Sequence, residues 1–442
     1  MLPDRLSPRR VAITGLGLVS PLGNSLPTFW SALAEGQSGV AWCEISPAVE
    51  TPLKYAGVAC EFSGKIDNFG PLPANQKKAI RKGLKLMCRE TQMAVAAAQH
   101  ALASAGLSES TPAVPERSGI VLGSDYMLTM PADYIDSMEK CVGEKGGFQF
   151  SRWGNEGLGE MAPLWMLKYL PNMPASHIAI LNDLRGPNNS LTMRESSSNL
   201  AVGEAFRTIQ RGHADCMVAG ATGTRILPMQ ALHALQTEQM ADETSIPAEA
   251  SRPFDKARTG MVAGEGAGML VLEEMETARD RGAKIYAEVL GSGSSLVANR
   301  KLKGNCQAAL SNAIKAALRD ARINVTELGH INAHGLSTTE SDVQEFAALE
   351  EALGPTSSQV PLIAPKSSFG NLGAGSGSIE LIASLLAFEH GRLPRVLNYQ
   401  TQDPACPVQA VTSEEVPPGT HFLNLSVTPQ GQAAALCIGI SQ

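Results

Sequence analysis

The chain contains the same order of strands and helices twice. An opening strand, a helix, a buried strand, and then a turn that begins another helix occur in both series. The paired segments are 10–17 with 285–291, 94–105 with 308–321, 119–123 with 331–334, and 193–206 with 361–389. This repetition indicates an internal duplication, and strands that alternate with helices predict mostly parallel sheets covered by helices, an α/β fold.

The size and charge of the chain limit its class. Its 442 residues exceed one ordinary domain, and we expect two halves, residues 1–277 and 278–442. A hydrophobic share of 43% and 42 glycines are typical of a soluble α/β protein with tight turns. The net charge of −7 does not indicate a nucleic-acid partner. The sequence has no apolar run long enough for a membrane helix, so we expect a cytoplasmic protein.

The cysteines do not indicate a metal site. They are scattered, without a Cys-x-x-Cys pair or a histidine at zinc spacing, so we expect reduced thiols, no metal and no cofactor. None of them lies at a predicted strand-to-helix turn. The eight are Cys43, Cys60, Cys88, Cys141, Cys216, Cys306, Cys406 and Cys437.

A glutamate occupies the most informative turn. Glu195 lies between a short apolar stretch and a helical pattern at 201–210, and a buried strand is predicted at 214–221. A turn of this kind directs its side chain toward the free N–H groups at the start of the following helix. The pattern therefore predicts that the Glu195 carboxylate lies in a site, or is held there as a structural anion.

The stretch 193–206 resembles the nucleophile turn of the β-ketoacyl–acyl-carrier-protein synthases, the elongating condensing enzymes of the thiolase superfamily. Their pattern is Thr-Ala-Cys-(Ala/Ser)-(Thr/Ser)-Gly, followed after a few residues by Gly-Glu-Ala-Phe, which stands here at 203–206. This alignment places Glu195 where the family has its nucleophilic cysteine. The segments 252–256 and 264–268 also follow the family pattern.

The resemblance implies a complete architecture. It implies a thiolase-like five-layer αβαβα sandwich made from two duplicated halves, with residues 125–174 as a cap over the acyl pocket on the dimer side. It implies an acyl carrier protein as a partner, and a homodimer or a heterodimer with an active ketosynthase. The family's dimer strand follows the nucleophile helix, so we expect residues 215–221 to form it.

The rest of the family's catalytic apparatus is partly present. His334 matches the first histidine and Lys366 matches the lysine, but Asn371 stands where the second histidine belongs. An amide can donate a hydrogen bond to a carbonyl but cannot carry a proton. The C-terminal loop also departs from the family pattern, because Pro429 removes an N–H from the segment that supplies an oxyanion donor.

Four interpretations follow from these changes. The chain is a non-condensing partner similar to the chain-length factors of type II polyketide systems, or an acyl-thioester enzyme in which Glu195 and His334 carry out changed chemistry. Alternatively it is a still active 3-oxoacyl–acyl-carrier-protein synthase of fatty acid or polyketide biosynthesis, or a purely structural protein. Because the nucleophile, one histidine and the oxyanion loop are all altered, the first interpretation is favoured.

Overall fold

The computed structural model describes residues 9–43, 53–107, 114–413 and 415–440, so the first eight residues of the predicted N-terminal half lie outside the described part. The described residues form a sheet of ten strands in the order β10-β9-β11-β12-β8-β1-β7-β6-β4-β5, and a separate antiparallel pair, β2 and β3. The strands are β1 (Val11–Val19), β2 (Val40–Trp42), β3 (Tyr55–Gly57), β4 (Ser118–Ser124), β5 (Asn188–Leu191), β6 (Cys216–Thr224), β7 (Glu265–Glu274), β8 (Ala287–Leu296), β9 (His330–Asn332), β10 (Leu362–Ile363), β11 (His421–Val427) and β12 (Gln432–Gly439).

The large sheet consists of two halves with the same topology, which confirms the predicted duplication. β5-β4-β6-β7-β1 in the first half corresponds to β10-β9-β11-β12-β8 in the second. In each half three strands are parallel and the next two are antiparallel. The expectation of mostly parallel sheets was therefore wrong for the inner strands: a short turn joins β11 to β12, and such a connection permits only antiparallel pairing.

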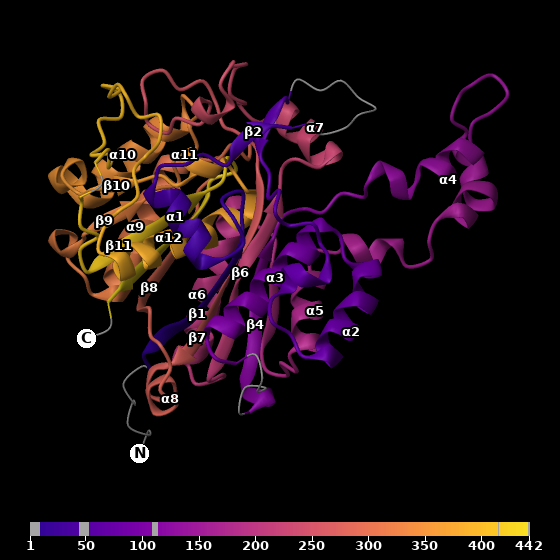
Figure 1. Ribbon diagram of the computed structural model, residues 1–442. Helices are drawn as coiled ribbons and strands as arrows, with labels where there is room; N and C mark the ends of the chain where they lie inside the picture. Colours follow the sequence, from indigo (N-terminus) through magenta and orange to yellow (C-terminus); the bar gives the residue numbers. More distant parts are fainter. Residues whose placement is uncertain (1–8, 44–52, 108–113, 414, 441–442) are drawn as a thin grey trace.

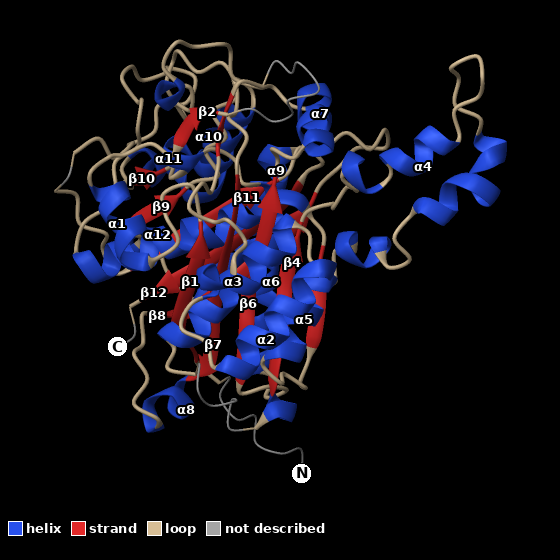
Figure 2. Cartoon of the chain, turned by 45° about the vertical axis from the view of Figure 1, so that its right-hand side comes forward, coloured by secondary structure: helices blue, strands red, loops and turns tan. Residues whose placement is uncertain are grey.

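Helices separate and cover the two halves, as Figures 1 and 2 show. The middle layer contains α6 (Ser197–Gln210) and α12 (Ser376–His390), which contact each other and strands of both halves. On the outside, α3 (Arg89–Ser104) packs on the first half, and α9 (Cys306–Ala321) with α10 (Ser341–Leu353) covers the second. This arrangement is the five-layer sandwich that the family resemblance implied.

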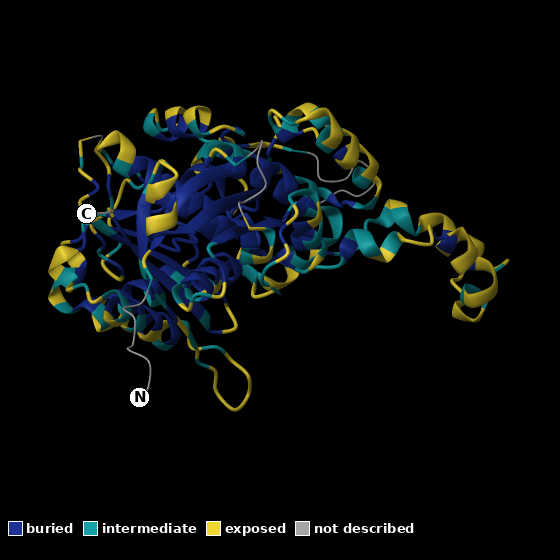
Figure 3. Ribbon diagram, turned by 90° about the horizontal axis from the view of Figure 1, so that it is seen from below, coloured by how far each residue is buried: buried dark blue, intermediate teal, exposed yellow. Residues whose placement is uncertain are grey.

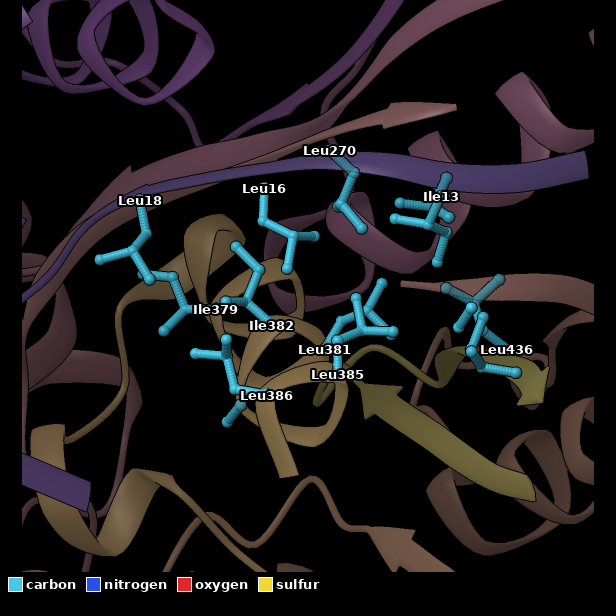
Figure 4. Close-up of a cluster of buried hydrophobic side chains, with 14 of the residues drawn as sticks. Ile13, Leu16, Leu18, Leu270, Ile379, Leu381, Ile382, Leu385, Leu386 and Leu436 are labelled. Atoms are coloured by element: carbon cyan, nitrogen blue, oxygen red, sulfur yellow. The ribbon is translucent and has the colours of Figure 1, made fainter. Parts of the chain in front are cut away.

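The apolar sequence of α12 explains its central place. Its residues from Ser376 to Ala387 are all buried and, apart from Glu380, they are apolar or small; a helix of this kind lies inside the protein. Figure 4 shows Ile379 and Ile382 of this helix packed below Leu16 of β1 and Leu270 of β7. This contact fixes the start of α12, and therefore the preceding loop, beside the first half of the sheet.

The helical spacing of apolar residues predicts one long helix at 77–105, but the structure interrupts it. α2 (Ala74–Gly83) ends at a glycine, a single 3₁₀ turn follows, and the backbone is extended at Met87 before α3 begins. Glycine is a poor helix former, and the break allows the buried Met87 and Ile80 to pack in the same cluster. The other helices are α1 (Leu26–Ala34), α4 (Ile135–Lys140), α5 (Met173–Leu181), α7 (Pro228–Thr237), α8 (Met275–Asp280) and α11 (Lys366–Phe369).

The expected dimer strand at 215–221 was wrong. Residues 216–221 belong to β6, which pairs with β4 on one side and with β7 on the other, so its backbone groups are already used. The free edge of the first half is β5, where Asn188 and Asn189 are exposed. Any strand pairing with a second chain at this edge must therefore use β5.

The segment 125–174 projects from the body as an arm that carries α4, as seen at the right of Figure 1 and in Figure 3. Only its root packs firmly, through Met127 and Tyr169 against Cys88. Many of its large apolar side chains are exposed: Ile135, Met138, Val142, Phe148, Phe150, Leu158, Leu164 and Met166. An apolar surface of this extent is typical of an interaction site. No helix among the described residues is long and apolar enough to cross a membrane.

The packing of α12 gives a stability prediction. Ile382→Ala removes a fully buried side chain from the middle layer and should lower the free energy of unfolding by about 2–5 kcal/mol. Leu302→Ala, at a site that is 85% exposed, is the control and should change it by less than about 0.5 kcal/mol. Urea unfolding followed by circular dichroism measures both, and equal effects would contradict this assignment of the core.

Candidate active site

Glu195 lies at the turn between β5 and the buried helix α6. A 3₁₀ turn (Arg194–Ser196) leads directly into the helix, and the Glu195 side chain is almost completely buried. Arg194 has a left-handed backbone with φ of +50°, a conformation that non-glycine residues adopt at an energetic cost. The turn therefore directs Glu195 inward, toward the interior between the two halves.

Three cationic or amide groups surround the Glu195 carboxylate. Arg225 donates from Nη2 to Oε1 at 2.8 Å, and Asn371 donates from Nδ2 to the same oxygen at 3.2 Å. The second oxygen, Oε2, lies 3.4 Å from Nε of Arg194. Both oxygens thus face positive or hydrogen-bond-donating groups.

The ion pairs continue on both sides of Glu195. Arg225, whose side chain is fully buried, also contacts Asp125 Oδ2 at 3.1 Å, and Arg194 pairs with Glu238. The five residues in the order Glu238, Arg194, Glu195, Arg225 and Asp125 form an alternating series that we call the charge chain. It extends from the end of α7 to the first residue of the arm.

The charge chain determines the protonation of Glu195. Burial alone would raise the pKa of this carboxyl group, but Arg225 and then Arg194 hold the pKa well below its ordinary value. Burial raises the pKa of Asp125, although Arg225 opposes the shift. Glu195 is therefore a carboxylate near neutral pH and a weak base.

His334 and Lys366 form a second group beside Glu195. Lys366 begins α11 and donates from Nζ to the His334 carbonyl at 2.7 Å, with His334 Nδ1 at 3.4 Å; it also pairs with the buried Glu380. Because an ammonium group only donates, Nδ1 is the acceptor and the ring proton is assigned to Nε2. Burial, followed by Lys366, lowers the pKa of His334 well below its ordinary value, so the ring is neutral.

The loops around these residues are held by buried hydrogen bonds. Glu345 accepts the backbone N–H groups of His334 and Gly335 at 2.7 and 2.8 Å. Asn371 Oδ1 accepts from the Gly373 backbone and from Ser376 Oγ at the start of α12. Both side chains that follow the second-half strands are therefore fixed before any ligand binds.

The structure brings the four sequence-predicted residues into one buried region. Asn371 is hydrogen-bonded to Glu195, and His334 contacts Lys366. Glu195 and His334 interact electrostatically, since the carboxylate opposes the fall in the pKa of His334. His334 is hydrogen-bonded to Lys366 and Glu345 rather than to Glu195.

A pocket of about 270 Å³ reaches this region from the surface, and its lining includes His334, Leu336, Thr338, Glu238, Cys306 and Pro429. Pro429 lies in the turn between β11 and β12, which two backbone hydrogen bonds close, Thr428 N to Gln432 O and Gly431 N to Thr428 O. Where the family pattern has a flexible oxyanion loop, this chain has a short hydrogen-bonded turn.

Sequence reasoning did not identify Arg225, Arg194, Asp125 or Glu238 as parts of the site. Arg225 directly follows the buried strand β6, and a basic residue at the end of an apolar strand was the available signal. Asp125 likewise follows β4, where it ends. The sequence around Arg225 or Asp125 does not show that either residue lies near Glu195, because that placement depends on the strand order β6-β4-β5.

Comparison with known proteins identifies the family. The model of the β-ketoacyl synthase N-terminal domain matches residues 8–278, and that of the C-terminal domain matches residues 286–400. The chain is 32% identical to 3-oxoacyl-[acyl-carrier-protein] synthase 2 of Synechocystis sp. over 92% of each chain, and 34% identical to that of Vibrio harveyi over 89% of each. The chain belongs to the β-ketoacyl synthase family.

Solved structures of this β-ketoacyl synthase family agree over the whole fold. One match is a chain of the AntDE:AntF complex, a type II polyketide acyl carrier protein bound to its ketosynthase. It has a TM-score of 0.81 and 26% identity, over 98% of this chain and 100% of that one. The ishigamide ketosynthase/chain length factor matches with the same TM-score, identity and coverage. The likeness to β-ketoacyl synthases thus extends over both halves of the chain.

The charge chain gives a prediction on stability and pH. Glu195→Gln leaves Arg225 with one carboxylate and should cost about 3 kcal/mol of unfolding free energy at pH 7, and Arg225→Met should cost a similar amount. The double variant should lose less than the sum of the two by about 1–3 kcal/mol, because each single change breaks the same pair. Urea unfolding of the four proteins measures this coupling, and additive losses would contradict it.

The same pair fixes the sign of the pH dependence. The folded pKa of Glu195 lies below the unfolded one, so its stabilisation is full above the ordinary value of about 4.3 and is lost as the pH falls through the folded pKa. The stability difference between the native chain and Glu195→Gln should therefore be constant from pH 8 to about pH 5 and should shrink only in stronger acid.

Proposed function

We propose that this β-ketoacyl synthase-like chain does not condense through a covalent acyl thioester, and that it acts as a partner of an active ketosynthase, similar to a chain-length factor. One observation carries the proposal: Glu195, at the position proposed for the nucleophile, is buried and paired with Arg225, Arg194 and Asn371. Acyl transfer in this family requires a nucleophile that attacks a thioester, and a carboxylate fixed by two guanidinium groups is a poor one.

Two further features support loss of condensation. Asn371 cannot exchange a proton where the family has its second histidine, and its amide is already used by Glu195. The hydrogen-bonded turn at Pro429 replaces the loop that supplies an oxyanion donor. Proton exchange by a second histidine and an oxyanion donor would both still be needed with a different nucleophile, and both are missing.

An acyl-thioester enzyme with changed chemistry is the second candidate. It is favoured by the pocket that reaches His334, whose Nε2–H can donate to a carbonyl oxygen. The depressed pKa of Glu195 counts against a general-base role, because a base works best with a pKa near the working pH. The negative charge would also repel the carboxylate of a malonyl group.

The edge strand β5 supports association with a second chain. Beside it, a groove of about 450 Å³ is lined by Leu191, Met193, Leu200 and Gly203, among others, and the apolar arm leaves the same half of the sheet. We propose that β5 pairs with its counterpart in a second copy or in an active ketosynthase. An acyl carrier protein is a further proposed partner, since the solved AntDE:AntF complex contains an acyl carrier protein bound to its ketosynthase.

The proposal predicts that no acyl-enzyme forms. After incubation with acyl carrier protein thioesters of several chain lengths, intact mass spectrometry should show no acyl adduct, whereas an active synthase treated in parallel should be acylated. Glu195→Cys alone should give little condensation, since the loss of a single oxyanion donor costs about a hundredfold to a thousandfold in rate. Robust carbon–carbon bond formation by this variant would mean that the chain is a synthase with one altered residue.

The proposal also predicts a dimer that depends on the β5 edge. Met193→Glu places a charge in the groove and should weaken association at micromolar concentration, whereas Trp42→Glu, at an exposed site on β2, should not. Light scattering of the chain alone, and of the chain co-expressed with an active ketosynthase, measures the association. A monomer in both preparations would contradict the partner role, and equal effects of the two variants would contradict the assignment to β5.

A further inference from the structure

The pocket stops short of the residue at the centre of the site. The described residues that line it include His334 and Glu238 but not Glu195 or Asn371. Glu195 and Asn371 are 2% and 1% exposed. A barrier therefore separates the pocket from the carboxylate, although His334 lies on the pocket side.

Arg194 lies behind the pocket wall: it does not line the pocket itself, but it is paired with Glu238, which does. Its left-handed backbone precedes Glu195, its Nε lies 3.4 Å from Glu195 Oε2, and its Nη2 pairs with Glu238 in the pocket wall. Its Nη1 also donates to Oε1 of Gln430, in the β11–β12 turn, at 3.5 Å. One side chain thus joins the turn before α6, the end of α7 and the C-terminal turn.

The burial of the partners shows that this contact is closed. The Arg194 side chain is 14% exposed and that of Glu238 is 7% exposed. The Arg194 guanidinium group donates a charge-assisted hydrogen bond to Glu238, which is stronger than a neutral one, and it lies in ion-pair contact with Glu195. The pair is therefore a fixed wall rather than a mobile surface contact.

We propose that the Arg194–Glu238 pair is a roof that limits the depth of the pocket, with Glu238 facing the pocket and Arg194 behind it, so that an entering thioester reaches His334 but not position 195. The proposal rests on the function proposed above and adds a specificity determinant to it. The pocket then admits the thioester end of a ligand and excludes an acyl chain directed at the nucleophile position. Arg194 is a positioning residue here, because it acts through the shape of the pocket.

A reporter thiol tests the roof without acyl chemistry. In Glu195→Cys, the alkylation rate of the introduced thiol by iodoacetamide and by the bulkier N-ethylmaleimide is followed by peptide mass spectrometry. Adding Glu238→Gln or Arg194→Ala should raise the rate at least tenfold, with the larger increase for N-ethylmaleimide. Arg185→Ala, a matched change of an exposed arginine that pairs with Asp183, should leave the rate unchanged.

Two features keep the result clear. Removing Arg194 also removes a positive charge, which raises the thiol pKa and slows alkylation, so a faster rate reports access. The buried Cys216 and Cys437 must stay unlabelled in every variant, which excludes general unfolding. Rapid alkylation of Glu195→Cys with Arg194 and Glu238 intact, or equal rates in all variants, would overturn the roof.

A second measurement uses the otherwise native chain. Glu238→Gln should increase amide hydrogen exchange in the peptide that contains residues 193–200, while Arg185→Ala should not. Unchanged exchange in Glu238→Gln would overturn the proposal even where the cysteine variant fails to fold. Acylation of the native chain would instead contradict the proposed function. The two failures can be told apart, because the roof experiments do not involve acyl transfer.

Discussion

The ion pair between Arg225 and Glu195 determines what the site can do. A fully buried guanidinium group is tolerated only beside anions, and Arg225 has two, Asp125 and Glu195. The pair makes Glu195 a poor base and a poor nucleophile, because its charge is paired with Arg225 and its Oε1 accepts hydrogen bonds from Arg225 and Asn371. The other altered residues follow the same logic: Asn371 donates to the carboxylate, and Arg194 covers it. The site is organised around a fixed charge rather than around a reacting atom.

The duplicated fold explains why these residues meet at all. Each half ends its parallel strands at a turn that leads into a middle-layer helix, α6 in the first half and α12 in the second. The turn before α6 supplies Arg194 and Glu195, and the turn before α12 supplies Asn371. Packing of α12 between the sheets brings the two turns together, so the geometry of the site depends on apolar contacts such as Ile379 with Leu16.

Much of this architecture could be predicted from the sequence. The repeated order of elements indicated the duplication, and the family motifs indicated the four residues around which the structure builds its buried region. The charge chain could not be predicted, because Arg225 and Asp125 meet Glu195 only through the lateral order of β6, β4 and β5. The dimer strand was misassigned for the same reason: sequence order does not show which strand lies at the edge. The break before α3 was missed because the apolar spacing continues through Met87 while the backbone there is extended.

The charge chain also explains why a single substitution would not recreate a synthase. A cysteine at position 195 would lie between two guanidinium groups, which favour the thiolate and lower its pKa. The nucleophilicity of a thiolate falls with its pKa, so the gain in ionised fraction is partly offset by weaker attack on the thioester. The same cysteine would lack a second imidazole, since Asn371 remains, and Arg194 would still stand between it and the pocket. Recovery of condensation therefore requires changes to the surrounding charges as well as to the nucleophile, and the present residues are consistent with one another only as a closed ion-pair network.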